Sequence, residues 1–226
     1  MAEAGSESDS SIGDLSEAIA ALEKVVKLLV QRPSETQMME VQWRLARACF
    51  YASEQEKEAS IRLSWIVKGE DAGQNAVRER PDRVEGYYYL AVLKGRRAEI
   101  SGLGFSAMIL ARKVEDLGEE AAKIDPSFED GAPYRLLAML YANAPPWPTS
   151  IGDMDKAIEF AQKAIDQSDY PMNHLIMAEV LIEADELEDA RNELKKVLAA
   201  PKVGRWANDG ERWRPHARRL LSKIQE

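Results

Sequence analysis

Two stretches decide the fold, Ala76-Val-Arg-Glu-Arg-Pro81 and Ala121-Ala-Lys-Ile-Asp-Pro126. Each is a helix-forming run closed by a proline, and the two prolines lie 45 residues apart. The same spacing separates two further pairs of small or apolar positions, Leu45-Ala46 from Leu90-Ala91 and Gly73 from Gly118. Self-similarity at a fixed period of a few tens of residues is typical of stacked repeats of one supersecondary unit.

Two more units follow, marked by Leu137-Ala138 and Met177-Ala178, so the successive spacings are 45, 47 and 40 residues. In the last unit a large residue precedes the Leu-Ala-like pair, another follows it, and an alanine, a large residue and Pro201 come later. This is the order of the tetratricopeptide (TPR) repeat. Small residues let two antiparallel helices cross closely, and units must stack because one pair alone cannot bury its apolar face.

We therefore predict an all-α fold, a TPR-like solenoid of antiparallel helix pairs with N- and C-terminal capping helices. We expect residues 1–12 to be a disordered acidic segment and residues 13–226 to form a single repeat domain. The expected units are 35–81, 82–126, 127–169 and 170–201, with a capping helix at 206–226. No stretch shows the period-two alternation of a strand.

The segment before the first unit, 14–30, has the periodicity of an amphipathic helix, with Ala18, Leu22, Val25 and Leu29 on one face. Between the helices of the third unit, the loop 142–154 contains Pro145-Pro-Trp-Pro148. Consecutive prolines favour extended backbone, so this loop is stiff. We expect the large ring of Trp147 to pack against the repeat body near the groove mouth, with exposure for a partner as the alternative.

Charge argues against nucleic acid as the main partner, because the 226 residues carry a formal net charge of -9. The segment 202–226 is nevertheless basic, with seven Lys or Arg against three acids, which leaves -13 for the rest. This basic end either packs beside the acidic body or docks an acidic partner. No apolar stretch is long enough to span a bilayer. The N-terminus lacks the pattern of a signal peptide. We expect a cytoplasmic protein, or a periplasmic one if a leader has been removed.

The sequence offers few candidate catalytic residues. The single cysteine, Cys49, lies on an apolar helical stripe and is expected to be buried. Only two histidines exist; His174 takes a packing position in its repeat, and His216 lies on the basic terminal helix, where we expect it to be solvated. Structural zinc needs about four Cys or His ligands. We predict no enzyme activity, no metal and no cofactor.

Several motifs resemble one branch of TPR-like proteins over about residues 40–225: Trp43-Arg-Leu-Ala-Arg-Ala, Ile124-Asp-Pro-Ser-Phe, Gly131-Ala-Pro-Tyr-Arg-Leu-Leu-Ala, Ala144-Pro-Pro-Trp-Pro with Ser150-Ile-Gly-Asp, and Asn173-His-Leu-Ile-Met-Ala-Glu. The chain resembles the T component of tripartite ATP-independent periplasmic (TRAP) transporters and the eukaryotic regulators of microtubule dynamics. The resemblance implies an all-helical domain with a hydrophobic groove or pore that acts by association with other proteins. The chain departs from the T components because it shows no export signal and no lipid-anchor cysteine.

The first helix of each unit has a stripe that faces away from its partner helix, and stacking places such stripes side by side. The predicted groove residues are Trp43, Arg47, Phe50, Tyr51, Tyr88, Val92, Arg96, Arg135, Met139, Leu175, Glu179 and Ile182. Aromatics and arginine dominate binding hot spots. We therefore expect a scaffold that holds a peptide or protein in an apolar groove with a cationic centre. The alternative from the TRAP resemblance is a protein that encloses a small apolar or carboxylate ligand.

A competing interpretation is that the terminal helix or long helices cover this surface, so that the aromatics are core and the arginines pair internally. Among the arginines, we expect Arg135 to pair with Glu179 or Glu183 and Arg96 to face the ligand. The sequence leaves the partner's identity and the oligomeric state open.

Overall fold

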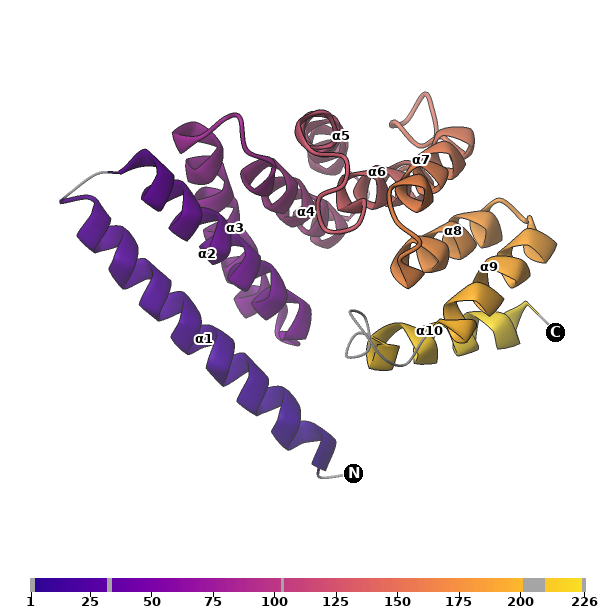
Figure 1. The fold of residues 1–226 in the computed structure, drawn as a ribbon, viewed down its shortest axis with the longest axis horizontal. Helices are drawn as coiled ribbons and strands as arrows, with labels where there is room; N and C mark the ends of the chain where they lie inside the picture. The colour runs from indigo at the N-terminus through magenta and orange to yellow at the C-terminus, as the bar shows by residue number, and fades with distance from the viewer. Residues whose placement is uncertain (1–2, 32–33, 103, 201–209, 225–226) are drawn as a thin grey trace. The chain divides into compact units, whose positions relative to one another are not determined.

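The computed structural model describes residues 3–31, 34–102, 104–200 and 210–224, and over these ranges the regular structure is helical (Figure 1). The helices are α1 (Glu3–Leu29), α2 (Glu35–Gln55), α3 (Ala59–Glu79), α4 (Val84–Ser101), α5 (Phe105–Ile124), α6 (Ala132–Asn143), α7 (Met154–Gln167), α8 (Pro171–Glu183), α9 (Leu187–Ala199) and α10 (Gly210–Lys223). The all-α prediction is confirmed. None of the described helices is both long and apolar enough to cross a membrane.

The helices pack in consecutive pairs, α2 with α3, α4 with α5, α6 with α7 and α8 with α9. The pairs match the predicted repeat units within a few residues. They group into two compact units, which we call unit 1 (residues 1–124) and unit 2 (residues 125–226); the single repeat domain stays a prediction. The division falls between the second and third repeats.

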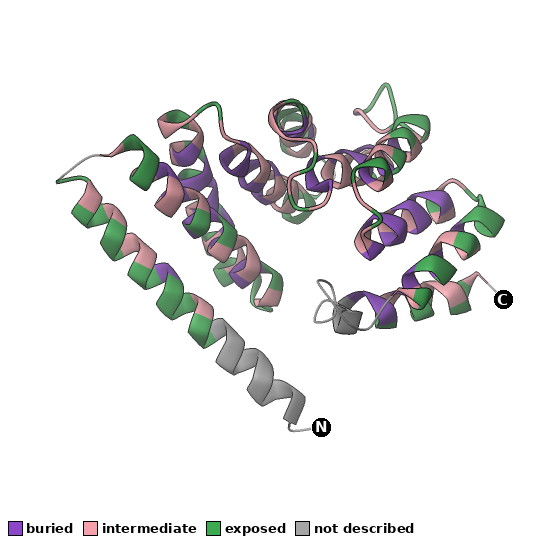
Figure 2. Ribbon diagram, in the orientation of Figure 1, coloured by how far each residue is buried: buried purple, intermediate pink, exposed green. Residues whose placement is uncertain are grey.

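Small residues lie at the helix crossings, as the repeat pattern predicts. Ala46, Ala91, Ala138 and Ala178 are all fully buried. A Cβ added to Gly73 of α3 would lie 3.0 Å from the Cβ of Leu90 in α4. Figure 2 shows the resulting pattern, with buried positions along α2, α3 and α4 in unit 1 and along most of α8 in unit 2.

The helix starts in unit 2 have clear local causes. Pro133 and Pro171 stand in the first turns of α6 and α8, where a missing N–H costs nothing. Asp153 caps α7 by accepting a hydrogen bond from the backbone N of Lys156 at 3.0 Å. Gly131, at φ +87°, precedes α6 in the left-handed region, and a Cβ there would lie 2.9 Å from the carbonyl oxygen of Ala164.

α1 begins at Glu3, and the disorder expected for residues 1–12 stays a prediction. The face that α1 buries is rotated from the expected one, because Ile19 is buried whereas Ala18 and Val25 are exposed. The helix turns Ile19 inward in place of Ala18, since Ile buries more apolar area than Ala.

The expected packing of Trp147 is wrong. The side chain is 84% exposed. The loop closes on its own backbone, because the N of Gly152 donates to the carbonyl of Pro145 at 2.9 Å and the N of Thr149 donates to that of Pro146 at 3.0 Å. These bonds hold the tip of the loop without any contribution from the indole ring.

Candidate partner-binding surface

In unit 1 the first helices of the two repeats, α2 and α4, lie side by side and bring their aromatic side chains together. Trp43 stacks on Tyr89 with ring centroids 6.1 Å apart and an interplanar angle of 15°. Tyr88 meets Tyr89 edge-on at 5.1 Å, and Phe50 lies 5.2 Å from Tyr51. We call Trp43, Phe50, Tyr51, Tyr88 and Val92 the aromatic face; all five are partly exposed.

Tyr89 was not among the predicted site residues, yet it is the buried ring on which Trp43 rests. Three successive tyrosines, 87 to 89, make it impossible to say from periodicity alone which one points to the crossing. The aromatic face is thus fixed from below by a core residue, which limits the rotamers open to Trp43. Such pairs contribute about 0.5–1.5 kcal/mol beyond the area they bury.

Arginines surround the aromatic face. The guanidinium of Arg44 lies 4.5 Å from the centre of the Trp43 ring, and that of Arg47 lies 5.8 Å from the Tyr51 ring. Both arginines are exposed. Glu40 pairs with Arg44 and accepts a hydrogen bond from Trp43 Nε1 at 3.1 Å. Burial raises the pKa of Glu40, but the bonds from Arg44 and Trp43 outweigh burial, so the pKa lies below its usual range.

Arg96, which we expected to face a ligand, is paired within the chain. Its Nη2 donates to Glu54 at 2.9 Å, and its Nη1 donates to Glu99 at 3.0 Å. The guanidinium also lies 6.0 Å from the Phe50 ring. Burial lowers the pKa of Arg96, yet the two carboxylates outweigh it and the pKa is raised. The guanidinium of Arg96 is therefore neutralised from within α2 and α4.

Open space remains beside Arg96, because a Cβ added to Gly95 would meet nothing within 4 Å. Gly95 is partly exposed and lies one turn beyond Val92 on the same side of α4. A backbone or side chain of another molecule can approach α4 closely at this point.

In unit 2 the predicted stripe has other partners. Arg135 of α6 does not reach Glu179 or Glu183; it donates to Asn173 Oδ1 at 2.6 Å and to the backbone carbonyls of Glu129 and Asp130. Its guanidinium also lies 5.3 Å from the Tyr170 ring. Met139 of the same helix is partly exposed. Arg135 thus joins α6 to α8 as a structural brace.

The α8 part of the predicted groove is covered. Leu175 belongs to a core cluster with Trp213 and Ala217 of α10, and Ile182 packs against this cluster. Glu179 bonds to His216 Nε2 of α10 at 2.6 Å, so His216 is not simply solvated. Burial raises the pKa of Glu179, an effect that His216 opposes. At these three positions α10 packs on the face, which is the arrangement that the competing interpretation describes.

The histidine and cysteine of the interior serve packing. His174 is buried as expected, and its two ring nitrogens bond to Glu193 at 2.6 Å and to Asp169 at 2.7 Å. These bonds raise the pKa of His174 against the effect of burial, with Glu193 the largest influence. Burial raises the pKa of the Cys49 thiol to about 12, so the thiol stays protonated at neutral pH.

Comparison with known structures supports the repeat fold. The chain is similar to the crystal structure of TTC0263, a thermophilic TPR protein of Thermus thermophilus, with a TM-score of 0.68 and 16% sequence identity. The match covers 96% of this chain and 93% of the other. At this identity the likeness shows the fold alone. A search of the curated proteins found no match.

The N-terminal half of the chain matches the model of a protein family. Residues 12–128, which contain all of unit 1 from α2 onward together with the aromatic face, match the model for regulator of microtubule dynamics protein 1-3. This stretch is more than half of the 226 residues. The chain belongs to the regulator of microtubule dynamics protein 1-3 family.

Proposed function

We propose that this chain is a non-enzymatic protein-interaction scaffold that binds a segment of another protein on the aromatic face of α2 and α4. The observation that carries the proposal is the group of partly exposed aromatic side chains beside two exposed arginines on adjacent first helices. Trp, Tyr and Arg are the residues that most often carry binding energy at interfaces. The support from Tyr89 beneath Trp43 pre-organises this face, which reduces the entropy lost on binding.

The chemistry of the surface favours a partner segment with apolar anchors and acidic flanks. Arg44 and Arg47 are exposed at its edge, with Arg44 paired to Glu40, whereas Arg96 is partly buried and bound to Glu54 and Glu99. Apolar anchors would fill the space beside Gly95 and against Tyr88. The family's name links its members to microtubule dynamics, and we extend that link to this chain: the bound segment would belong to a protein of the microtubule.

The test is an assay of microtubule growth and shortening with purified tubulin. Wild-type protein should change the growth rate or the frequency of switching to shortening, and Arg47→Glu should abolish the effect. Arg112→Glu is the matched control, because it makes the same charge change at another exposed arginine of unit 1, on α5. Equal activity of the two variants would place the binding surface elsewhere, and an inactive wild type would contradict the link to microtubules.

A further inference from the structure

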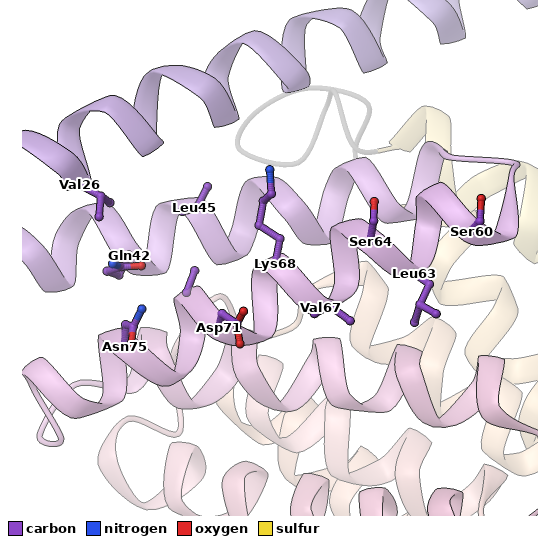
Figure 3. Close-up of a pocket in the computed structure, with 11 residues that line it drawn as sticks. Val26, Gln42, Leu45, Ser60, Leu63, Ser64, Val67, Lys68, Asp71 and Asn75 are labelled. Carbon is purple, nitrogen blue, oxygen red and sulfur yellow. The ribbon is translucent and has the colours of Figure 1, made fainter.

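Unit 1 has a second apolar surface on the other side of α2. A cavity of about 650 Å³ opens to solvent between α1 and α3, with α2 as its floor (Figure 3). Val26 of α1 and Gln42 and Leu45 of α2 line it, and α3 supplies the remaining residues. At 100° per residue, Gln42 and Leu45 lie on the opposite side of α2 from Arg47 and the aromatic face. We call this cavity the α1–α3 groove.

Apolar side chains that line the groove remain at least partly exposed. Leu63 and Val67 of α3 are exposed, and Val26 of α1 is partly exposed. A terminal helix of a repeat protein normally turns a polar face outward, because no further repeat covers it. α1 packs on α2 and reaches α3 through the Glu23–Lys68 ion pair of 2.9 Å. The apolar positions around the groove therefore lack the cover that the rest of the repeat provides.

The α3 wall has the spacing of a helix-packing seam. Ser60, Ser64, Val67 and Asp71 all line the groove, at intervals of four, three and four residues. This spacing averages about 3.7 residues, so the four positions share one face of α3, on which a second helix can pack. From Ser60 to Asn75 the wall extends about 22 Å at 1.5 Å per residue, the length of a helix of about 15 residues.

One end of the groove is polar and acidic. Gln42, Asp71 and Asn75 lie together there in Figure 3. No hydrogen bond or ion pair engages the Asp71 carboxylate within the described residues, and the buried Gln42 amide reaches only the sulfur of Met38, at 3.7 Å. The nearby cation, Lys68, is already paired with Glu23. A carboxylate beside two amides is suited to a Lys or Arg side chain.

We propose that the α1–α3 groove binds an amphipathic helix of a partner protein, about 15 residues long, with a Lys or Arg at one end. Its apolar stripe packs on Leu63 and Val67, and its cation meets Asp71. This is the helix-in-groove mode of recognition, in which anchors repeat at three- and four-residue intervals. The α1–α3 groove and the aromatic face are separate surfaces of unit 1, so binding at one can be tested without the other.

The experiment is a selection of random peptides of about 16 residues, displayed on phage, against the full chain. Enriched peptides are then measured against three variants. Val67→Glu places a charge in the apolar wall at a partly solvated position; Asp71→Arg reverses the polar end. Gln74→Glu is the matched control, because it adds a negative charge to an exposed position of α3 outside the groove. Thermal melts establish that each variant is folded.

The expected result is a set of peptides with helical apolar spacing and a terminal Lys or Arg. Val67→Glu should lower the affinity for these peptides at least about tenfold, equivalent to about 1.4 kcal/mol. Gln74→Glu should leave the affinity unchanged. Asp71→Arg should prefer peptides in which the cation is replaced by Glu. Failure to enrich helical peptides, or equal binding to Val67→Glu, would overturn the proposal. So would a concentration-dependent dimer in sedimentation velocity that Val67→Glu abolishes, because the groove would then hold a second copy of the chain.

Discussion

Gly69 lies where α3 crosses its neighbours, and the structure leaves no room there for a methyl group. A Cβ would lie 2.8 Å from Cδ1 of Leu93 and 2.9 Å from Cβ of Cys49. The leucine tip can rotate, but the Cys49 Cβ is fixed by the α2 backbone. Overpacking of this kind costs about 1–3 kcal/mol, whereas Ala is favoured over Gly in a helix by about 0.5–1 kcal/mol. We therefore expect Gly69→Ala to lower the free energy of unfolding by about 1–2 kcal/mol.

Gly95→Ala is the matched control, with the opposite expected sign. Its Cβ would meet nothing within 4 Å and its φ is not positive, so only the helix preference remains. The free energy of unfolding should rise by about 0.5–1 kcal/mol. Urea titration followed by far-ultraviolet circular dichroism measures both variants, and because both lie in unit 1 they report on the same transition. If Gly69→Ala is as stable as wild type, the close crossing of α3 with α2 and α4 is wrong.

Four further predictions concern single sites. Trp147→Ala should change the unfolding free energy by no more than about 0.5 kcal/mol, since the ring is exposed; a large drop in melting temperature would show that the ring packs. Ala178→Leu should cost about 1–3 kcal/mol in urea titration, and the same change at the exposed Ala199 should be nearly neutral. Arg96→Ala should destabilise by about 1–2 kcal/mol, because Glu99 loses its partner and Glu54 keeps only the longer contact of 3.7 Å with Arg62; unchanged stability would mean that the pairing contributes nothing. The pKa of His174 is raised by its carboxylate partners, so its contribution is complete below the unfolded imidazole pKa of about 6.5 and is lost as pH rises through the higher folded value. Wild type should therefore lose stability relative to His174→Gln as the pH rises from the unfolded to the folded pKa of His174. Parallel pH profiles of the two proteins in thermal melts would refute this.

The repeat could be predicted because it depends on local patterns. The spacing of Ala46, Ala91, Ala138 and Ala178 marks the crossings, and all four are buried in the structure. The prolines at 133 and 171 mark helix starts in the same way. These signals act within one helix or between neighbouring helices, where sequence separation and spatial separation agree.

The pairing of charges could not be predicted, because it joins residues far apart in the chain. Glu54 lies 42 positions before Arg96, and Glu179 lies 37 before His216. Which of many acids meets a given arginine depends on helix rotation, and α1 shows that rotation is easily misjudged by one residue. The hydrogen bonds of Asn173 were easier to anticipate than these ion pairs. Asn173 is a polar residue among apolar residues of α8, and a buried polar side chain needs hydrogen-bond partners. Its side chain bonds to Arg135 and to the carbonyls of Asp130, Ala164 and Ser168.

The two units use the same repeat surface in different ways, and this difference follows from α10. In unit 2 the terminal helix fills the face of α8 with Trp213 and Ala217 and pairs His216 with Glu179. In unit 1 the equivalent face carries Trp43 and Phe50, which stay partly exposed. A surface that stays partly exposed within its own unit must satisfy its own charges to remain stable. The bonds of Arg96 to Glu54 and Glu99 do this. In the proposed function, binding energy comes from apolar contact and from Arg44 and Arg47, so added salt should weaken association moderately rather than abolish it.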